Sequence, residues 1–177
     1  SVTSNAIWSE FQTRWLMENL DFISVSMDGS PNTQDRQRPL RDSQPSSPIV
    51  MLNLRRLDEG NFKYGIRMTV CSPWTNLAED VRYILENTNC RSIQVEPAFN
   101  TQRGEHCQPD QEQARAFVQA FIEAHIIAKQ YGANLTYSGA RPQTITSAFC
   151  SAPFNALVVN PEDQIVACYE ISDQLHP

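Results

Sequence analysis

The chain has 177 residues, 41% of them hydrophobic, which is enough to build one hydrophobic core of ordinary size. A formal net charge of -6 and a pI near 5.0 argue against the basic surface that sequence-independent nucleic-acid binding requires. No apolar run approaches the roughly 20 residues that span a bilayer, and no signal-peptide pattern opens the chain. We therefore expect a cytoplasmic protein that associates with neither nucleic acid nor a membrane.

Helix and strand patterns alternate four times along the first 140 residues. The expected helices and the strands that follow them are residues 7–19 and 20–29, 47–60 and 62–70, 75–87 and 91–97, and 110–132 and 133–139. Such alternation is typical of a parallel sheet with crossover helices, so the predicted fold class is α/β.

Local signals support two of these helices. Asn76 and Glu79 have the spacing of a capping box at the start of the third helix. In the fourth helix the apolar residues fall on one predicted buried stripe, which consists of Ala114, Phe117, Val118, Phe121, Ile122 and Ile126. Gly132 is expected to end that helix.

Residues 31–48 form a connector rich in Pro, Ser and Arg, and we interpret this connector as a loop too polar to pack. It follows directly after a strand end, where folds of this class place their ligands. The arginines in it, Arg36, Arg38 and Arg41, are suited to hold a carboxylate or phosphate. After residue 140 the alternation ends, and residues 156–168 read as strand, turn and strand, so we expect a second domain at 141–177.

Polar side chains within the predicted strands are candidate ligand contacts. Ser24 and Ser26 share one face of their strand, and Asp28 follows in the turn. Arg67 alternates with apolar residues on the next strand, so it is expected to require an anionic partner in the interior, and Glu96 is a candidate for that partner.

The five cysteines are odd in number and widely scattered, which argues against the disulfide framework of a small secreted protein. Cys150 and Cys168 flank the predicted hairpin, whose turn brings their two sulfurs toward one end. Thiolates suit zinc or an iron–sulfur cluster, but two cysteines do not complete a four-ligand site. A buried hairpin with incidental thiols and half of a metal site both fit this spacing.

Taken together, these segments resemble the radical S-adenosylmethionine enzymes that carry a C-terminal SPASM extension. "VTSNA" resembles the third barrel strand of this family, "ISVSMDG" the fourth, "IRMTV" the fifth and "IQVEP" the sixth. "QDRQRP" is similar to the family's Asp-x-x-Arg segment, matched by Asp35 and Arg38. The SPASM pattern of Cys, Gly and Cys is matched by Cys150, Asp163 in place of Gly, and Cys168.

The resemblance implies a partial (β/α) barrel, S-adenosylmethionine and 4Fe-4S clusters as cofactors, and a peptide or protein as the substrate of the parent enzyme. It places Ser24 and Ser26 near the ribose and methionyl groups of S-adenosylmethionine, Arg67 near its carboxylate, and residues 95–97 near its adenine. Asp28, Arg38 and Glu96 complete the expected cofactor-binding set. Cys150 and Cys168 are implied to be the first two ligands of an auxiliary cluster.

Two family motifs are missing from these 177 residues: Cys-x3-Cys-x2-Cys, which holds the radical-generating cluster, and the Gly-Gly-Glu-Pro motif of the second strand. We therefore expect the chain to be an inactive C-terminal fragment of a radical enzyme, binding no cofactor by itself. An exposed sheet edge predicts a homodimer. The competing interpretation is a non-enzymatic α/β binding module whose hairpin holds zinc or free thiols.

Overall fold

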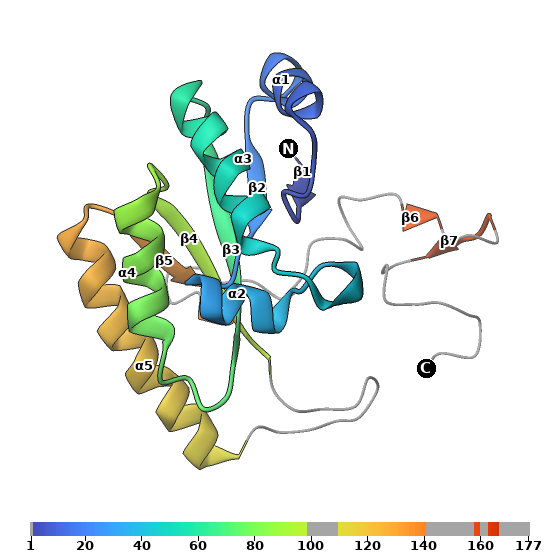
Figure 1. The fold of residues 1–177 in the computed structure, drawn as a ribbon. Coiled ribbons are helices and arrows are strands. Elements are labelled where there is room, and N and C mark those ends of the chain that lie inside the picture. The colour runs from blue at the N-terminus through green and yellow to red at the C-terminus, as the bar shows by residue number, and fades with distance from the viewer. Residues whose placement is uncertain (1, 99–109, 141–157, 160–162, 167–177) are drawn as a thin grey trace. The chain divides into compact units, whose positions relative to one another are not determined.

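The computed structural model describes residues 2–98, 110–140, 158–159 and 163–166 (Figure 1). The chain divides into two compact units, Ser1–Ala140 and Arg141–Pro177, at the position where the sequence pattern changes. The described part of the first unit contains a five-stranded sheet, and that of the second contains a two-stranded sheet.

The first unit is a parallel α/β layer, which confirms the predicted fold class. Its strands are β1 (Val2–Ser4), β2 (Ile23–Ser26), β3 (Tyr64–Cys71), β4 (Ser92–Ala98) and β5 (Asn134–Tyr137). Its helices are α1 (Glu10–Asn19), α2 (Pro31–Gln37), the 3-10 turn η1 (Arg41–Ser43), α3 (Ser47–Glu59), α4 (Leu77–Asn87) and α5 (Gln111–Gln130). The strands pair in chain order, all in parallel, and among the described residues the sheet stays open at β1 and β5.

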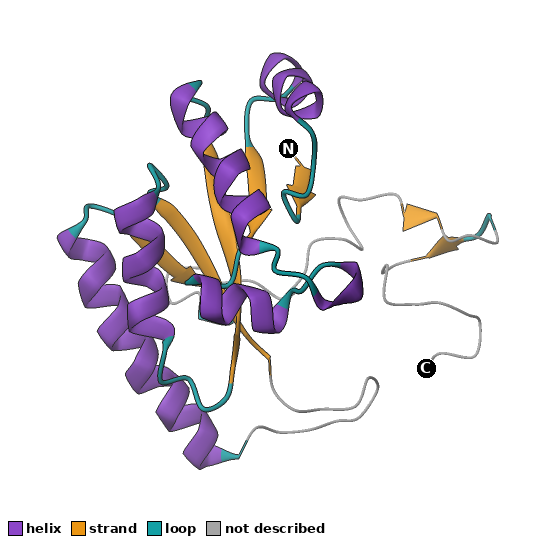
Figure 2. Ribbon diagram, in the orientation of Figure 1, coloured by secondary structure: helices purple, strands orange, loops and turns teal. Residues whose placement is uncertain are grey.

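One face of this sheet carries the hydrophobic core, because side chains alternate between the two faces along each strand. In Figure 1 and Figure 2 helix α3 lies in front of β2 and β3, with α4 and α5 to the left beside β4 and β5, and these helices pack on that face. Its fully buried strand residues include Ile23, Val25, Ile66, Met68, Ile93, Val95 and Leu135. Burying each such side chain stabilises the fold by about 1.5–3 kcal/mol, so this face holds the sheet and the helices together.

The structure differs from the sequence prediction in where a capping box forms. The capping box lies at Ser9 and Gln12 of α1, where the Gln12 backbone N–H donates to Ser9 Oγ and the Ser9 N–H donates to Gln12 Oε1. The box predicted at Asn76 is wrong, because Asn76 has helical backbone angles (φ -93°, ψ -4°) and makes no side-chain cap bond. Its helical conformation gives the side chain no position from which to accept the N3 amide hydrogen.

The buried stripe of α5 is narrower than predicted. Val118, Ile122 and Ile126 are 54%, 48% and 55% exposed, whereas Phe117 and the alanines Ala124 and Ala128 are buried. Small residues at 124 and 128 let the helix approach the core closely, and this rotates the larger side chains away from it.

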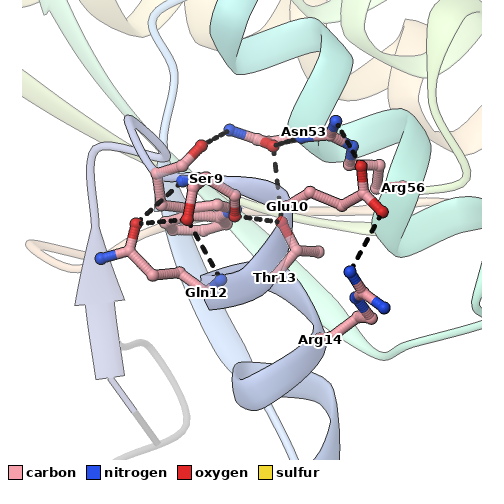
Figure 3. Close-up of polar contacts among 8 residues, drawn as sticks. Ser9, Glu10, Gln12, Thr13, Arg14, Asn53 and Arg56 are labelled. Carbon is pink, nitrogen blue, oxygen red and sulfur yellow. Dashed lines mark hydrogen bonds and ion pairs between the residues drawn. The ribbon is translucent and has the colours of Figure 1, made fainter.

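Helix α1 is fastened to α3 by polar contacts as well as by packing (Figure 3). Asn53 of α3 is fully buried, and its Nδ2 donates to the carbonyl oxygens of Ala6 (2.9 Å) and Trp8 (3.0 Å). Its Oδ1 accepts from Arg56 Nη1 at 2.9 Å, and Arg56 also forms an ion pair with Glu10 of α1. Asn53 thus fixes the loop between β1 and α1, where Ala6 has a positive φ of 57°.

The described part of the second unit is an antiparallel pair, β6 (Val158–Val159) and β7 (Ile165–Val166). This confirms the predicted hairpin. Asp163 has a φ of 60°, a left-handed conformation that Asp adopts more readily than most residues.

None of the helices in the described ranges combines the length and the apolar character needed to cross a bilayer.

Candidate functional site

The second face of the sheet is polar, and we call it the open face. It is defined by the strand residues that alternate with the buried ones, and the strand register arranges them in three rows. The rows are Ser24, Gly65, Ser92 and Asn134; then Ser26, Arg67, Gln94 and Thr136; and then Thr69, Glu96 and Ser138 at the carboxyl end. These rows are polar except at Gly65, where a Cβ would lie 3.0 Å from the Phe22 ring, and the next register pair on this face is Cys71 and Ala98. The polar rows are suited to bind a ligand rich in hydrogen-bonding groups.

Arg67 is exposed and lies beside Ser26 in the strand register. The expected ion pair with Glu96 is absent among the described residues. Because Arg67 is exposed, water compensates its charge and no internal anion is required. Within the described part of the chain its guanidinium therefore remains available to an anionic ligand group.

Glu96 is held by two hydrogen bonds from neighbouring residues instead. Gln94 Nε2 donates to its Oε1 and Ser138 Oγ donates to its Oε2, both at 2.6 Å. The bonds fix the carboxylate on the half-buried part of β4 and leave it lone pairs that can accept from a ligand.

Asp28 is an internal anchor, with 2% of its surface exposed. Its Oδ1 accepts from the Thr69 backbone N–H at 2.8 Å, and its Oδ2 accepts from Arg38 Nε at 2.7 Å. Arg38 Nη2 also donates to Thr69 Oγ1 at 2.9 Å. The structure therefore brings Asp28 and Arg38 together, and both oxygens of Asp28 are already used within the chain.

Part of the connector of residues 31–48 is packed, so the prediction of a loop too polar to pack is wrong for its helix and for Ser46 and Ser47, whereas residues 41–45 are exposed. The first half of the connector is helix α2, with Pro31 at the first turn, and Thr33 and Gln34 are buried. Gln34 Oε1 accepts from the Asp28 N–H and Gln34 Nε2 donates to Ser46 Oγ, at 2.8 and 3.0 Å. Hydrogen bonds of this kind are the physical reason that so polar a segment can be buried.

Two further carboxylates organise this region. Asp35 accepts from the backbone N–H and the hydroxyl of Ser47 at 2.7 and 2.8 Å, and so caps the start of α3. Asp80 of α4 is 4% exposed and accepts from the Ser30 N–H and from Thr33 Oγ1, both at 2.8 Å. Asp80 was missed because its partners lie 50 and 47 residues away.

A cavity of about 180 Å³ lies between α2, the end of β3 and the start of α4. The lining residues that contribute polar groups to it include Asp28, Thr33, Arg36, Thr69, Asn76 and Asp80. The cavity is thus lined by Asp28 and Asp80, the two buried carboxylates described above.

The two cysteines that the structure describes differ in chemistry. Cys71 is exposed, whereas Cys90 is buried and burial raises its pKa to about 11, so its thiol stays protonated at neutral pH. Within the described ranges no three His, Cys, Asp or Glu side chains group in a way that fits a metal ion or cluster. Cys150 and Cys168, the predicted cluster ligands, lie outside the described residues.

No protein-family model matches the sequence, and comparison with the curated proteins gives no match. Solved structures do match. SuiB from Streptococcus suis bound to S-adenosylmethionine aligns with a TM-score of 0.62 and 16% identity, over 94% of this chain and 42% of SuiB. Histidine-tagged anSMEcpe with bound AdoMet aligns with a TM-score of 0.62 and 13% identity, over 76% of this chain and 37% of that one.

A third match is a domain of pyruvate-formate lyase-activating enzyme from Bacteroides vulgatus ATCC 8482, with a TM-score of 0.52, 15% identity and coverage of 77% of this chain and 79% of that domain. The predicted resemblance to radical S-adenosylmethionine enzymes is thereby confirmed at the level of the fold. The chain spans only about two fifths of the length of anSMEcpe and SuiB (37% and 42%).

Proposed function

We propose that the open face of the sheet binds S-adenosylmethionine as part of a radical enzyme that modifies a peptide or protein. The observation that carries this proposal is the coincidence of a fold shared with S-adenosylmethionine-bound structures and rows of polar side chains on one sheet face. The supporting neighbours are anSMEcpe with bound AdoMet, anSMEcpe with AdoMet and the Kp18Cys peptide, and SuiB with S-adenosylmethionine.

The residues present fit the chemical groups of this cofactor. Arg67, which has no ion-pair partner among the described residues, suits the methionyl carboxylate. The hydroxyls of Ser24 and Ser26 suit the ribose and methionyl groups, and Glu96 is an acceptor already oriented by Gln94 and Ser138. Arg38 keeps Nη1 for a ligand while its other nitrogens hold Asp28 and Thr69. When bound and cleaved with one electron from an iron–sulfur cluster, the cofactor would supply the 5'-deoxyadenosyl radical that abstracts a substrate hydrogen.

The described residues do not fit an iron–sulfur cluster. The assignment of Cys150 and Cys168 to an auxiliary SPASM cluster, and the cluster itself, remain part of the proposal and rest on their spacing around the hairpin.

The test is to express the full-length gene product anaerobically, reconstitute it with iron and sulfide, and measure 5'-deoxyadenosine release from S-adenosylmethionine. Release should occur and should fall in Arg67→Gln, while Arg55→Gln serves as a matched control because Arg55 is an exposed arginine on the surface of α3. No release by the reduced, iron-loaded protein refutes the proposal and favours a non-enzymatic binding module. Zinc bound at the hairpin would give that alternative its specific support.

A further inference from the structure

Residues 28–33, which comprise the turn after β2 and the first residues of α2, join the open face to the helix layer. They follow Ser26 and lead into α2, which precedes Arg38. Any ligand contact made by Arg38 therefore depends on where this turn is held, whereas Ser26 is held by the pairing of β2 with β3.

Two buried carboxylates hold the turn from opposite sides. Asp28 fastens it to strand β3 through the Thr69 N–H at 2.8 Å. Asp80 fastens it to helix α4 through the Ser30 N–H and Thr33 Oγ1, both at 2.8 Å. The first contact lies within the predicted site, whereas the second comes from a helix that contributes no residue to the open face.

The local backbone is shaped to admit the Asp80 carboxylate. Gly29 has a φ of 139°, a conformation that L side chains rarely adopt, and a Cβ at this position would overlap the Asp80 carboxylate. Asp80 forms no ion pair among the described residues, and its charge lies in the first turn of α4, where the helix dipole stabilises it.

We infer that Asp80 is a positioning residue for the ligand site: its carboxylate locks the β2–α2 turn and the start of α2 to α4 and so positions α2, which leads to Arg38, for binding. This inference rests on the proposed function, because it names a residue that acts on S-adenosylmethionine binding through others. A substitution that breaks the lock should weaken ligand affinity, and an isosteric substitution that keeps both hydrogen bonds should preserve it.

The chain offers a set of variants that separates these cases. Asp80→Ala removes both hydrogen bonds. Asp80→Asn retains an acceptor for the Ser30 N–H, and its amide can donate to the Thr33 hydroxyl, which rotates to accept. Ser30→Pro deletes only the backbone donor, because the φ of Ser30 is -58°, close to the value that proline fixes, and its ψ of 161° suits a residue before Pro31.

The affinity of the reduced, iron-loaded full-length protein for S-adenosylmethionine is measured by calorimetry. We expect Ser30→Pro to weaken it about tenfold, the loss of one hydrogen bond to a charged group, and Asp80→Ala, which removes two such bonds, to weaken it by at least as much. Asp80→Asn should stay within about threefold of the wild type, and the double variant Asp80→Ala, Ser30→Pro should be no weaker than Asp80→Ala alone, because both changes break the same contact. Glu79→Gln is the control, since Glu79 is an exposed carboxylate of the same helical turn.

Hydrogen–deuterium exchange of peptides covering residues 28–33, measured without ligand, provides an independent readout. Asp80→Ala should speed exchange in this segment by about tenfold, and Asp80→Asn and Glu79→Gln should leave it near the wild-type rate. Unchanged exchange in Asp80→Ala overturns the inference, as does equal loss of affinity in Glu79→Gln. If the wild type binds no S-adenosylmethionine, the proposed function fails, and the exchange data still decide whether Asp80 locks the turn.

Discussion

Replacing Asn53 by leucine should destabilise the first unit more than any surface substitution, because Asn53 supplies the polar link between α3 and the β1–α1 loop (Figure 3). Leucine is of similar size but leaves the Ala6 carbonyl, in a residue with no exposed surface, without its donor. One buried unsatisfied carbonyl costs about 1–3 kcal/mol, and loss of the bonds to Trp8 and Arg56 adds about 1 kcal/mol. The expected decrease in the free energy of unfolding is therefore about 3 kcal/mol, a large part of the stability of a typical domain.

Urea unfolding followed by tryptophan fluorescence measures this decrease, since all three tryptophans lie within Ser1–Ala140. Asn87→Ala is the matched control: Asn87 is exposed on α4, and its side chain donates only to the Tyr83 carbonyl one turn earlier. That control should change the unfolding free energy by less than about 0.5 kcal/mol. If Asn53→Leu also stays within that margin, the Asn53 hydrogen bonds do not hold the loop and the reasoning is refuted.

Three other outcomes follow from the same structure. Burial raises the pKa of Cys90 from the ordinary value of 9.0 for a thiol to about 11, so the unfolded state loses its proton first and the unfolding free energy should fall as the pH rises through this range. In Cys90→Ala the unfolding free energy, measured by urea titration at each pH, should fall less steeply than in the unmodified chain. An equal fall would contradict the assignment of this pH dependence to Cys90. Alkylation at neutral pH, analysed by peptide mass spectrometry, should modify Cys71 in the native protein and spare Cys90 until denaturant is added; rapid labelling of Cys90 would disprove its burial. A homodimer formed through the β1 edge would use Phe11 and Trp15, which are 72% and 52% exposed, so light scattering on the 177-residue chain should give twice 20.1 kDa and Phe11→Glu should restore the monomer mass. A monomer mass for the unmodified chain at micromolar concentration would rule that dimer out.

The sequence was sufficient for the parallel α/β fold because the signal for it is local. Apolar runs such as residues 23–27 and 92–96 alternate with polar residues at the period of a strand, and each is separated from the next by a helical pattern. Side-chain direction follows from the same period, which is why Ser24 and Ser26 lie on the face opposite Val25. The buried stripe of α5 was predicted less accurately, because the rotation of that helix depends on how closely Ala124 and Ala128 approach the core.

The candidate site was predictable only where it lies on strands. The connector was misinterpreted because polarity predicts exposure only when the polar groups lack partners, and here Gln34, Asp35 and Thr33 find partners at Ser46, Ser47 and Asp80. Contacts that join residues so far apart leave no local periodicity in the sequence.

The predicted site residues separate into two groups according to whether their polar atoms are already used. Both carboxylate oxygens of Asp28 already accept hydrogen bonds, from Thr69 and from Arg38, so Asp28 supports the site rather than contacting a ligand. Ser26 and Arg67 are adjacent in register, and within the described part of the chain neither side chain has a hydrogen-bonding or ionic partner. Glu96, on the next strand, already accepts one hydrogen bond at each carboxylate oxygen. Free donors therefore concentrate over β2 and β3, and the anionic end of a ligand should lie there, with its uncharged polar groups extending toward β4.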